Sequence, residues 1–180
     1  MPTITPWLWF DTEGEQAAEF YTSIFPNSRI THVARYGNAG PRPAGMVMTV
    51  SFELDGQRLA ALNGGSQFEF NEAISLLVDC RDQDEVDYYW SKLAEGGEEG
   101  PCGWLKDGYG LSWQIVPTRL EELINDPDPE ISQRVMAAML QMEDRRRCAR
   151  GGGRRRPRLA TYAAARLPDS AGRCPSNSAK

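Results

Sequence analysis

The alternation of apolar and polar residues is clearest from Gly103 to Pro117, where the sequence reads GWLKDGYGLSWQIVP. Residues 104–106 and 111–116 both have strand-like composition, and Asp107-Gly108 lies between them. Asp-Gly is a strong hairpin signal because glycine reaches positive φ without a Cβ clash. The pattern therefore predicts a β-hairpin. The connection is longer than two residues and contains Gly110, so we expect a bulged or wider turn.

The second arm of this hairpin has two distinct faces, because successive side chains of a strand point to opposite sides. Trp113 and Gln114 are neighbours in sequence, so only one of them can face a layer of helices. We expect Trp113 to face the helices, since it alternates with Leu111 and Ile115. We then expect the Gln114 side chain to point away from the helices, on the opposite face of the sheet.

An earlier stretch repeats this hairpin. Phe52–Asn63 aligns with Trp104–Ile115 at a constant offset of 52, which matches Asp55-Gly56 to Asp107-Gly108. The preceding helical segments, EFYTSIF and DYYWSKL, also carry aromatic residues at matching positions. Asp-Gly is common enough for one such match to be coincidence. Two elements that repeat in the same order favour an internal duplication.

Each half of the chain reads as strand, helix and then three strands. The first half has expected strands at 4–10, 28–36, 46–54 and 57–63, with a helix from about 12 to 25 that Thr12 and Glu15 open as a capping box. The second half has strands at 73–79, 98–102, 104–106 and 111–116, with a helix at 82–93. No crossover helices fit between the last three strands, so we predict an antiparallel-rich α+β fold.

The predicted organisation has four parts: a first βαβββ module at 1–66, a second at 67–117, C-terminal helices at 118–142 and a tail at 143–180. The last predicted helix carries an apolar, Met-rich stripe that includes Val135, Met136 and Met139. This stripe either packs on the domain or meets a partner subunit.

Charge divides the chain sharply. Residues 1–142 contain nine Lys and Arg against 22 Asp and Glu, a net charge of −13, whereas residues 143–180 have a net charge of +8. The acidic body argues against nucleic-acid binding by the folded part, because phosphates need a cationic surface. One interpretation of the tail is a disordered segment, such as an out-of-frame reading of the gene would produce. The other is a basic arm that binds nucleic acid or acidic lipid.

Composition gives a localisation. No apolar run approaches the roughly 18 residues that a membrane span needs, and the N-terminus lacks the basic region of a signal peptide. The four cysteines, Cys80, Cys102, Cys148 and Cys174, are scattered without metal-site spacing. We therefore predict a cytoplasmic protein with reduced thiols and no zinc site.

Several long stretches resemble the vicinal oxygen chelate (glyoxalase/bleomycin-resistance) superfamily of paired βαβββ modules. They resemble its PhnB-like branch in particular, which is often labelled as a 3-demethylubiquinone-9 3-methyltransferase domain. The stretches are ITPWLWF, EFYTSIFPNS, LNGGSQFEFNEAISLLVDC, EVDYYWSKLAEGG and CGWLKDGYGLSWQIVP. The resemblance implies curved, mixed sheets that form a cup, with the helices on the outside and frequent dimerisation.

The resemblance also implies where a divalent metal would sit in metal-dependent relatives, namely on His and Glu side chains at the first and last strands of each module. The sequence offers Pro6 or Trp7, Leu62 or Asn63, Ala73 and Gln114 at these places. Divalent metals of this class need imidazole or carboxylate donors. The only histidine, His32, lies elsewhere. We therefore expect no metal.

The methyltransferase label finds no cofactor motif either, since no glycine-rich loop follows a parallel strand to cradle an adenosyl group. One histidine cannot complete a Ser/His/Asp or Cys/His set. We expect no cofactor, and whether the chain is an enzyme stays open.

What remains is a cup with aromatic and amide walls, the usual lining of a small-molecule pocket. The candidate ligand-binding residues are Trp7, Trp9, Asn63, Phe68, Trp104 and Gln114. The sequence thus predicts a homodimeric, metal-independent protein that binds a small molecule. One alternative is a lyase, isomerase or transferase that acts on a small polar substrate in the same cup. Another is an interaction or nucleic-acid-binding protein that works through its basic tail.

Overall fold

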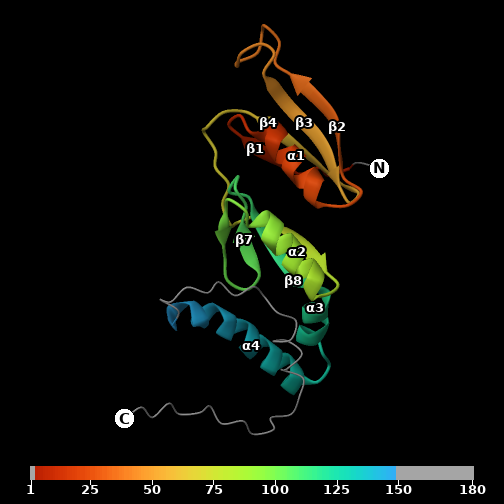
Figure 1. The fold of residues 1–180 in the computed structure, drawn as a ribbon, viewed down its shortest axis with the longest axis vertical. Coiled ribbons are helices and arrows are strands. Elements are labelled where there is room, and N and C mark those ends of the chain that lie inside the picture. The colour runs from red at the N-terminus through yellow and green to blue at the C-terminus, as the bar shows by residue number, and fades with distance from the viewer. Residues whose placement is uncertain (1–2, 149–180) are drawn as a thin grey trace. The chain divides into compact units, whose positions relative to one another are not determined.

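The computed structural model describes residues 3–148, which form eight strands and four helices (Figure 1). The first half contains β1 (Trp7–Phe10), α1 (Gly14–Ile24), β2 (Arg29–Arg35), β3 (Val47–Leu54) and β4 (Gln57–Asn63). The second half contains β5 (Leu76–Cys80), α2 (Gln83–Leu93), β6 (Glu98–Glu99), β7 (Trp104–Lys106) and β8 (Ser112–Pro117). The chain continues into α3 (Thr118–Ile124) and α4 (Pro129–Cys148).

The two halves have the same strand order. The first sheet has the order β1-β4-β3-β2 and the second has the order β5-β8-β7-β6. Strands β5 to β8 therefore occupy the same places in the second sheet as β1 to β4 do in the first. In the first sheet β1 pairs with β4 in parallel, while β2 with β3 and β3 with β4 are antiparallel. The predicted mixed α+β fold is confirmed, and the common strand order is what a duplicated βαβββ unit would give.

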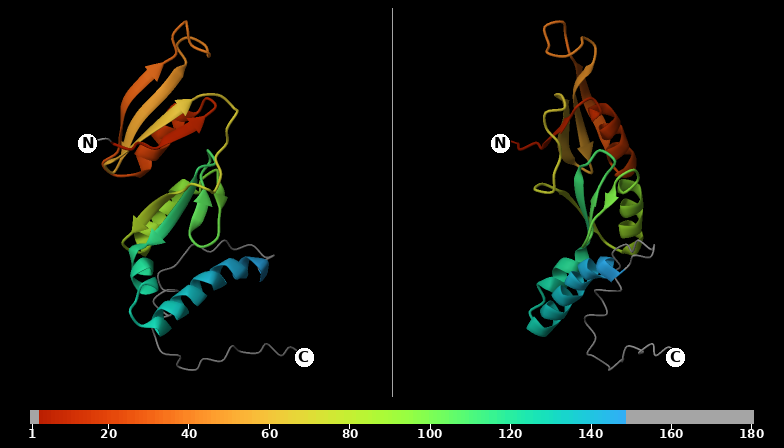
Figure 2. Two further views of the ribbon diagram at one scale, coloured as in Figure 1. Left: turned by 180° about the vertical axis from the view of Figure 1, so that it is seen from behind. Right: turned by 90° about the vertical axis from the view of Figure 1, so that its left-hand side faces the viewer.

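Helix α1 lies along one face of the first sheet (Figure 2). Its buried residues Ala17, Ala18, Tyr21 and Ile24 recur at three- and four-residue intervals, so they form one apolar stripe. The two alanines bring the helix close to the sheet, and the Tyr21 ring stacks on Phe52 of β3 with centroids 6.2 Å apart. The other face of the sheet is therefore free of this helix.

The described chain divides into two compact units. The first comprises residues 3–76, 92–98 and 106–113, and the second comprises 77–91, 99–105 and 114–148. The tip of the second hairpin thus belongs to the same unit as α1 and the first sheet. This partition follows contacts in space and cuts across the sequence modules.

The two Asp-Gly turns differ in length. Leu54 pairs with Gln57 across the first turn, where Asp55 (φ 44°) and Gly56 (φ 89°) form a two-residue connection with positive φ at both positions. In the second turn Asp107 N donates to Leu111 O at 3.0 Å, and Gly110 has φ 85°. The predicted wider turn around Gly110 is confirmed.

The longer turn changes the pairing of the second hairpin. Ile115 N donates to Gly103 O at 2.8 Å, so Trp104 lies opposite Gln114. In the first hairpin the matching residue, Phe52, lies opposite Leu59. The constant offset of 52 therefore aligns the first arms of the two hairpins, whereas their second arms are shifted in register by three residues.

The side chain of Asp107 is buried in the first unit, with 2% of the residue exposed. Its Oδ1 accepts hydrogen bonds from Tyr109 N at 2.8 Å and Leu111 N at 3.0 Å. Its Oδ2 accepts from Tyr21 Oη at 2.7 Å and Trp113 Nε1 at 2.8 Å. All four partners are donors, which suits a carboxylate. One side chain thus shapes its own turn and connects that turn to α1.

Burial raises the pKa of the Asp107 carboxyl, and the hydrogen bonds from Trp113, Tyr21, Tyr109 and Leu111 oppose that rise. Burial, followed by the nearby charge of Asp107, raises the pKa of the Tyr21 hydroxyl well above its ordinary value. Tyr21 therefore keeps its proton at neutral pH and remains a donor.

Trp113 faces the helix, as expected. Its ring lies 5.4 Å from that of Tyr21 and stacks on Phe25 at 5.5 Å, between centroids, with 2% of the residue exposed. Because Gln114 is the next residue of the strand, its side chain points to the opposite face of the second sheet.

The predicted capping box of α1 is wrong. The helix begins at Gly14, its N-cap Glu13 makes no side-chain cap bond, and the Glu13 carboxylate instead accepts from Thr12 N at 2.9 Å. Asn63, at the end of β4, supplies the missing acceptor to Gly14 N. A pattern search within one helix cannot find an acceptor 49 residues away.

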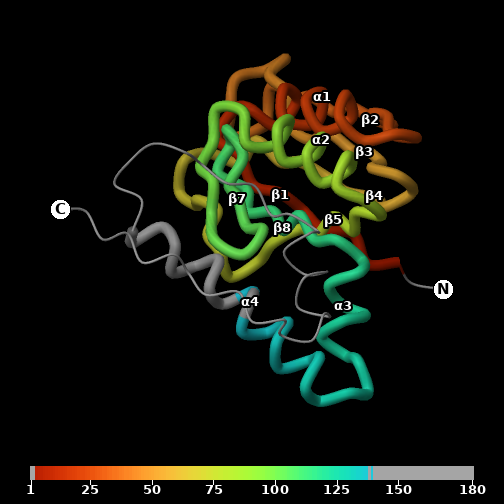
Figure 3. Tube along the Cα trace, turned by 60° about the horizontal axis from the view of Figure 1, so that its bottom comes forward, coloured from red at the N-terminus to blue at the C-terminus, as the bar shows by residue number. Residues whose placement is uncertain are grey.

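The C-terminal helices pack against each other in the second unit (Figure 3). Val135 is buried with Leu120 and Leu123, and Ile131 and Met139 lie against this cluster. Most of the apolar stripe on α4 therefore packs within the protein, as one of the two alternatives predicted. Met136 is the exception, with 38% of the residue exposed. Helix α4 continues to Cys148, past the predicted boundary at 142; the rest of the predicted tail, 149–180, lies outside the described residues.

Among the described helices, none has both the length and the apolar character needed to cross a membrane.

We expect Tyr21→Phe to lower the free energy of unfolding by about 2 kcal/mol, because it removes one bond to a buried carboxylate. Asp107→Asn should cost more, about 3 kcal/mol, because the amide NH2 must face either two backbone donors or Tyr21 and Trp113. Urea denaturation measures both values. Asp55→Asn, in the exposed two-residue turn, is the matched control and should change stability by less than about 0.5 kcal/mol. Equal losses at both turns would contradict the role given to Asp107.

Candidate functional site

The face of the first sheet opposite α1, which we call the open face, carries three rows of side chains. Phe52, Ala61 and Asn63 face α1, so by alternation Glu53, Ala60 and Leu62 belong to the open face. The strand register then sets the rows, which are Trp9–Leu62–Thr49–Ala34, Trp7–Ala60–Ser51–His32 and Arg58–Glu53–Arg29.

Trp9 is the most firmly held aromatic residue of the open face. Its indole Nε1 donates to Gly65 O at 2.7 Å, and its ring meets that of Phe68 edge-on with centroids 4.9 Å apart. A Cβ at Gly64 would lie only 2.3 Å from Trp9 Cζ2. The ring therefore lies against the Gly64 backbone, and only glycine fits there. We call Trp9, Phe68, Gly64 and Gly65 the aromatic corner.

Two aromatic side chains around this corner are largely exposed. Trp7 is 60% exposed and Phe68 is 63% exposed. Trp7 lies two residues before Trp9 on the same strand and the same face. The structure therefore brings Trp7, Trp9 and Phe68 into one region of the first unit.

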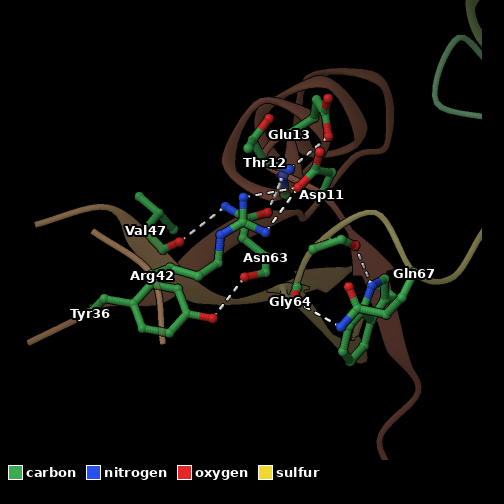
Figure 4. Close-up of polar contacts among 12 residues, drawn as sticks. Asp11, Thr12, Glu13, Tyr36, Arg42, Val47, Asn63, Gly64 and Gln67 are labelled. Carbon is green, nitrogen blue, oxygen red and sulfur yellow. Dashed lines mark hydrogen bonds and ion pairs between the residues drawn. The ribbon is translucent and has the colours of Figure 1, made fainter. Parts of the chain in front are cut away.

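Asn63 has a different place, on the α1 side of the sheet, with 2% of it exposed (Figure 4). Its Oδ1 accepts from Gly14 N at 2.8 Å, and its Nδ2 donates to Val47 O at 3.1 Å. Its backbone carbonyl accepts from Tyr36 Oη at 2.8 Å. The amide is thus used at both ends to join α1 to β3, which makes Asn63 a positioning residue.

An ion pair without any local sequence signal lies beside this network. Arg42 Nη1 and Nη2 both donate to Asp11 Oδ1 at 2.9 Å, from the loop between β2 and β3 (Figure 4). A Cβ at Gly65 would lie 3.2 Å from Arg42 Nη1, so the guanidinium borders the aromatic corner. The loop has no periodicity, so only a Gly/Pro-rich composition marked it in the sequence.

Trp104 and Gln114 belong to the second unit. They lie directly opposite each other on β7 and β8 and share one face of the second sheet, and both are half-buried.

The titratable groups offer little for nucleophilic or metal chemistry. Burial, followed by the charges of Glu85, Asp79 and Asp82, raises the pKa of the Cys80 thiol to about 12, so it is almost never the reactive thiolate. His32 is exposed on β2. Among the side chains that the structure describes, no three His, Cys, Asp or Glu residues gather closely enough to hold a metal ion.

Comparison with known proteins identifies the family. The model of the family described as 3-demethylubiquinone-9 3-methyltransferase matches residues 2–116. The chain belongs to this family. The family is the PhnB-like branch of the vicinal oxygen chelate superfamily, as the sequence resemblance predicted.

The solved structures agree with this membership. The PhnB protein from Bacillus cereus, which carries the same family description, is 35% identical with a TM-score of 0.59, and the match covers 65% of this chain and 100% of that one. Protein PA1353 from Pseudomonas aeruginosa is 20% identical with a TM-score of 0.53, over 64% of this chain and 96% of its own. A search of curated proteins found no relative.

The family description names a methyl transfer, and metal-dependent superfamily members use a divalent cation, but the residues present fit neither an adenosyl group nor a metal. The turn after β1 enters α1 directly, and the first helical amide, Gly14 N, is already bound by Asn63. That turn therefore does not fit an adenosyl cofactor held at a helix N-terminus. The Asn63 amide is equally unavailable to a metal, and Trp7, Leu62 and Gln114 supply no anionic donor.

We expect Gly64→Ala to displace the Trp9 indole, because the new methyl group would overlap the ring. The cost should be about 2 kcal/mol of unfolding free energy, typical of an overpacked site. The Trp9 Nε1–H signal in a ¹H–¹⁵N spectrum should shift and exchange faster with solvent. Gly37→Ala is the matched control, since a Cβ there meets nothing within 4 Å. An unchanged Trp9 signal in Gly64→Ala would show that the ring is not held against Gly64.

Proposed function

We propose that this protein binds a small organic molecule on the open face of its first sheet, with Trp7, Trp9 and Phe68 as the main contacts. The observation that carries the proposal is the aromatic corner, in which Trp9 is oriented by a hydrogen bond and a close backbone contact while Phe68 and Trp7 stay exposed. Neighbouring exposed aromatic residues commonly mark a binding surface.

The chemistry of the corner favours contact with an apolar or aromatic body. The only polar atom of the Trp9 ring is already satisfied by Gly65 O, so the ring offers apolar area. Polar groups stand nearby: Ser51 and Thr49 share the open face, and the Arg42–Asp11 pair borders the corner. An aromatic wall with a few polar groups suits a ligand that has both apolar and polar surface.

We further propose that Trp104 and Gln114, which share one face of the second sheet, contact a small molecule there. Asn63 enters as a positioning residue, because its amide holds α1 and β3. We also propose a cytoplasmic homodimer. The scattered cysteines, of which Cys80 is a free thiol, favour a reducing compartment, and superfamily membership favours dimerisation.

A thermal-shift screen of phenols, quinones, aromatic acids and aromatic amides tests the proposal. We expect at least one class to raise the melting temperature, because a ligand that binds the native state stabilises it by mass action. Trp7→Ala and Phe68→Ala should at least halve the shift, and both positions are exposed enough for the variants to fold. Tyr88→Ala, an aromatic residue of α2 that is 43% exposed, is the matched control. Shifts that are unchanged in Trp7→Ala and Phe68→Ala would place the ligand elsewhere.

A further inference from the structure

We infer that the ligand of the open face carries an anionic group, such as a carboxylate, and that Arg58 and Arg29 bind this group while Trp7 holds the apolar part. This inference rests on the proposed function. It narrows the substrate class to amphiphilic organic anions, in which an aromatic or aliphatic body is joined to a single negative end.

The first observation is a shared counter-ion. Arg29 Nη2 lies 2.7 Å from Glu53 Oε2, and Arg58 Nε lies 3.6 Å from Glu53 Oε1, so two cations flank one carboxylate. The Arg58 contact is longer than a hydrogen bond. Both arginine side chains are highly exposed, at 69% and 67%, whereas Glu53 is 18% exposed. The row therefore presents two exposed guanidinium groups that share a single carboxylate.

The other arginines of the first sheet's segment behave differently. Residues 3–76 contain four arginines and no lysine. Arg42 is matched by Asp11 at 2.9 Å, and Arg35 lies 3.7 Å from Glu15 and donates to Gly45 O. Arg29 and Arg58, in contrast, share one carboxylate, that of Glu53. The nearby carboxylate of Asp55, in the turn, accepts from Asn27 Nδ2 at 3.2 Å. Asp55 keeps its negative charge, so the proposed contact with an anion rests on the exposed guanidinium donors of Arg29 and Arg58 and not on a net positive charge.

The second observation is the position of this row relative to the aromatic residues. Trp7 lies opposite Ala60, and Arg58 is two residues before Ala60 on the same strand and face. Two residues span about 7 Å along a strand, and neighbouring strands are about 5 Å apart, so the two Cα atoms are separated by roughly 8 Å. Ala60, which lies between them, is a buried residue with only a methyl side chain, so a ligand would have to contact the exposed Trp7 and Arg58 side chains above it. A phenyl ring on Trp7 with a short chain would bring a carboxylate to the guanidinium of Arg58.

Arginine suits this role because its planar guanidinium binds carboxylates through two parallel hydrogen bonds. Exposed ion pairs contribute little to folding, so a purely stabilising function would leave little to select for in two arginines here. The same fact makes the test practical, because Arg58→Gln and Arg29→Gln should fold normally.

The probes are 4-phenylbutyrate and its neutral amide, 4-phenylbutanamide, titrated into the full chain by ¹H–¹⁵N NMR at low salt. We expect the acid to bind about tenfold more tightly than the amide and to lose that advantage as salt is raised. The advantage should disappear in the double variant Arg29→Gln/Arg58→Gln, while the amide affinity stays unchanged. Arg119→Gln, an exposed arginine of α3 paired with Glu122, is the matched control and should keep the full preference.

The outcomes separate the two proposals. Equal binding of acid and amide, or an acid preference that survives in the double variant, overturns the anionic ligand but leaves the aromatic site standing. Binding of neither probe overturns this inference and counts against the aromatic site as well. Acetate titrated alone completes the set: if it binds as tightly as 4-phenylbutyrate, the aromatic contact contributes nothing and the amphiphilic class is wrong.

Discussion

The buried carboxylate of Asp107 is the interaction on which the first unit depends. This carboxylate accepts four hydrogen bonds. Two of them fix its own turn, and the other two come from Tyr21 of α1 and from the Trp113 indole. Each carboxylate oxygen accepts two hydrogen bonds, so removing any one donor weakens the solvation of a buried charge while its oxygen keeps the other donor. The helix is therefore held against one face of the first sheet by a residue from the second half of the chain.

Because α1 is held on one side, the first sheet has one face that packs against the helix and one face that does not. The α1 face is filled with apolar residues and with Asn63, whose amide replaces the missing helix cap. The open face has no such helix, and it carries the exposed aromatic residue Trp7 and the two arginines that share Glu53. Structural bonding and the proposed ligand contacts thus lie on opposite sides of the same strands.

The sequence predicted the repeat, the α+β class and the family because each is recorded in local patterns such as alternation and Asp-Gly turns. It also grouped Trp7, Trp9 and Phe68 in one region. It missed the α1 cap and the Arg42–Asp11 pair because both join residues far apart in sequence, without any local signal. It placed Asn63 among the ligand contacts as an amide at the end of the first hairpin, whereas alternation puts its side chain on the α1 face. Asp107 was correctly given a turn role, but its bond to Tyr21 requires knowledge of which segments meet.

Intermolecular NOEs between 4-phenylbutyrate and isotope-labelled protein show whether the open face of the first sheet binds an organic ligand. We expect NOEs from the phenyl protons to the exposed Trp7 indole and from the methylene beside the carboxylate to the Arg58 side chain. NOEs confined to α1 or α4, with none to Trp7, would rule out binding at the open face.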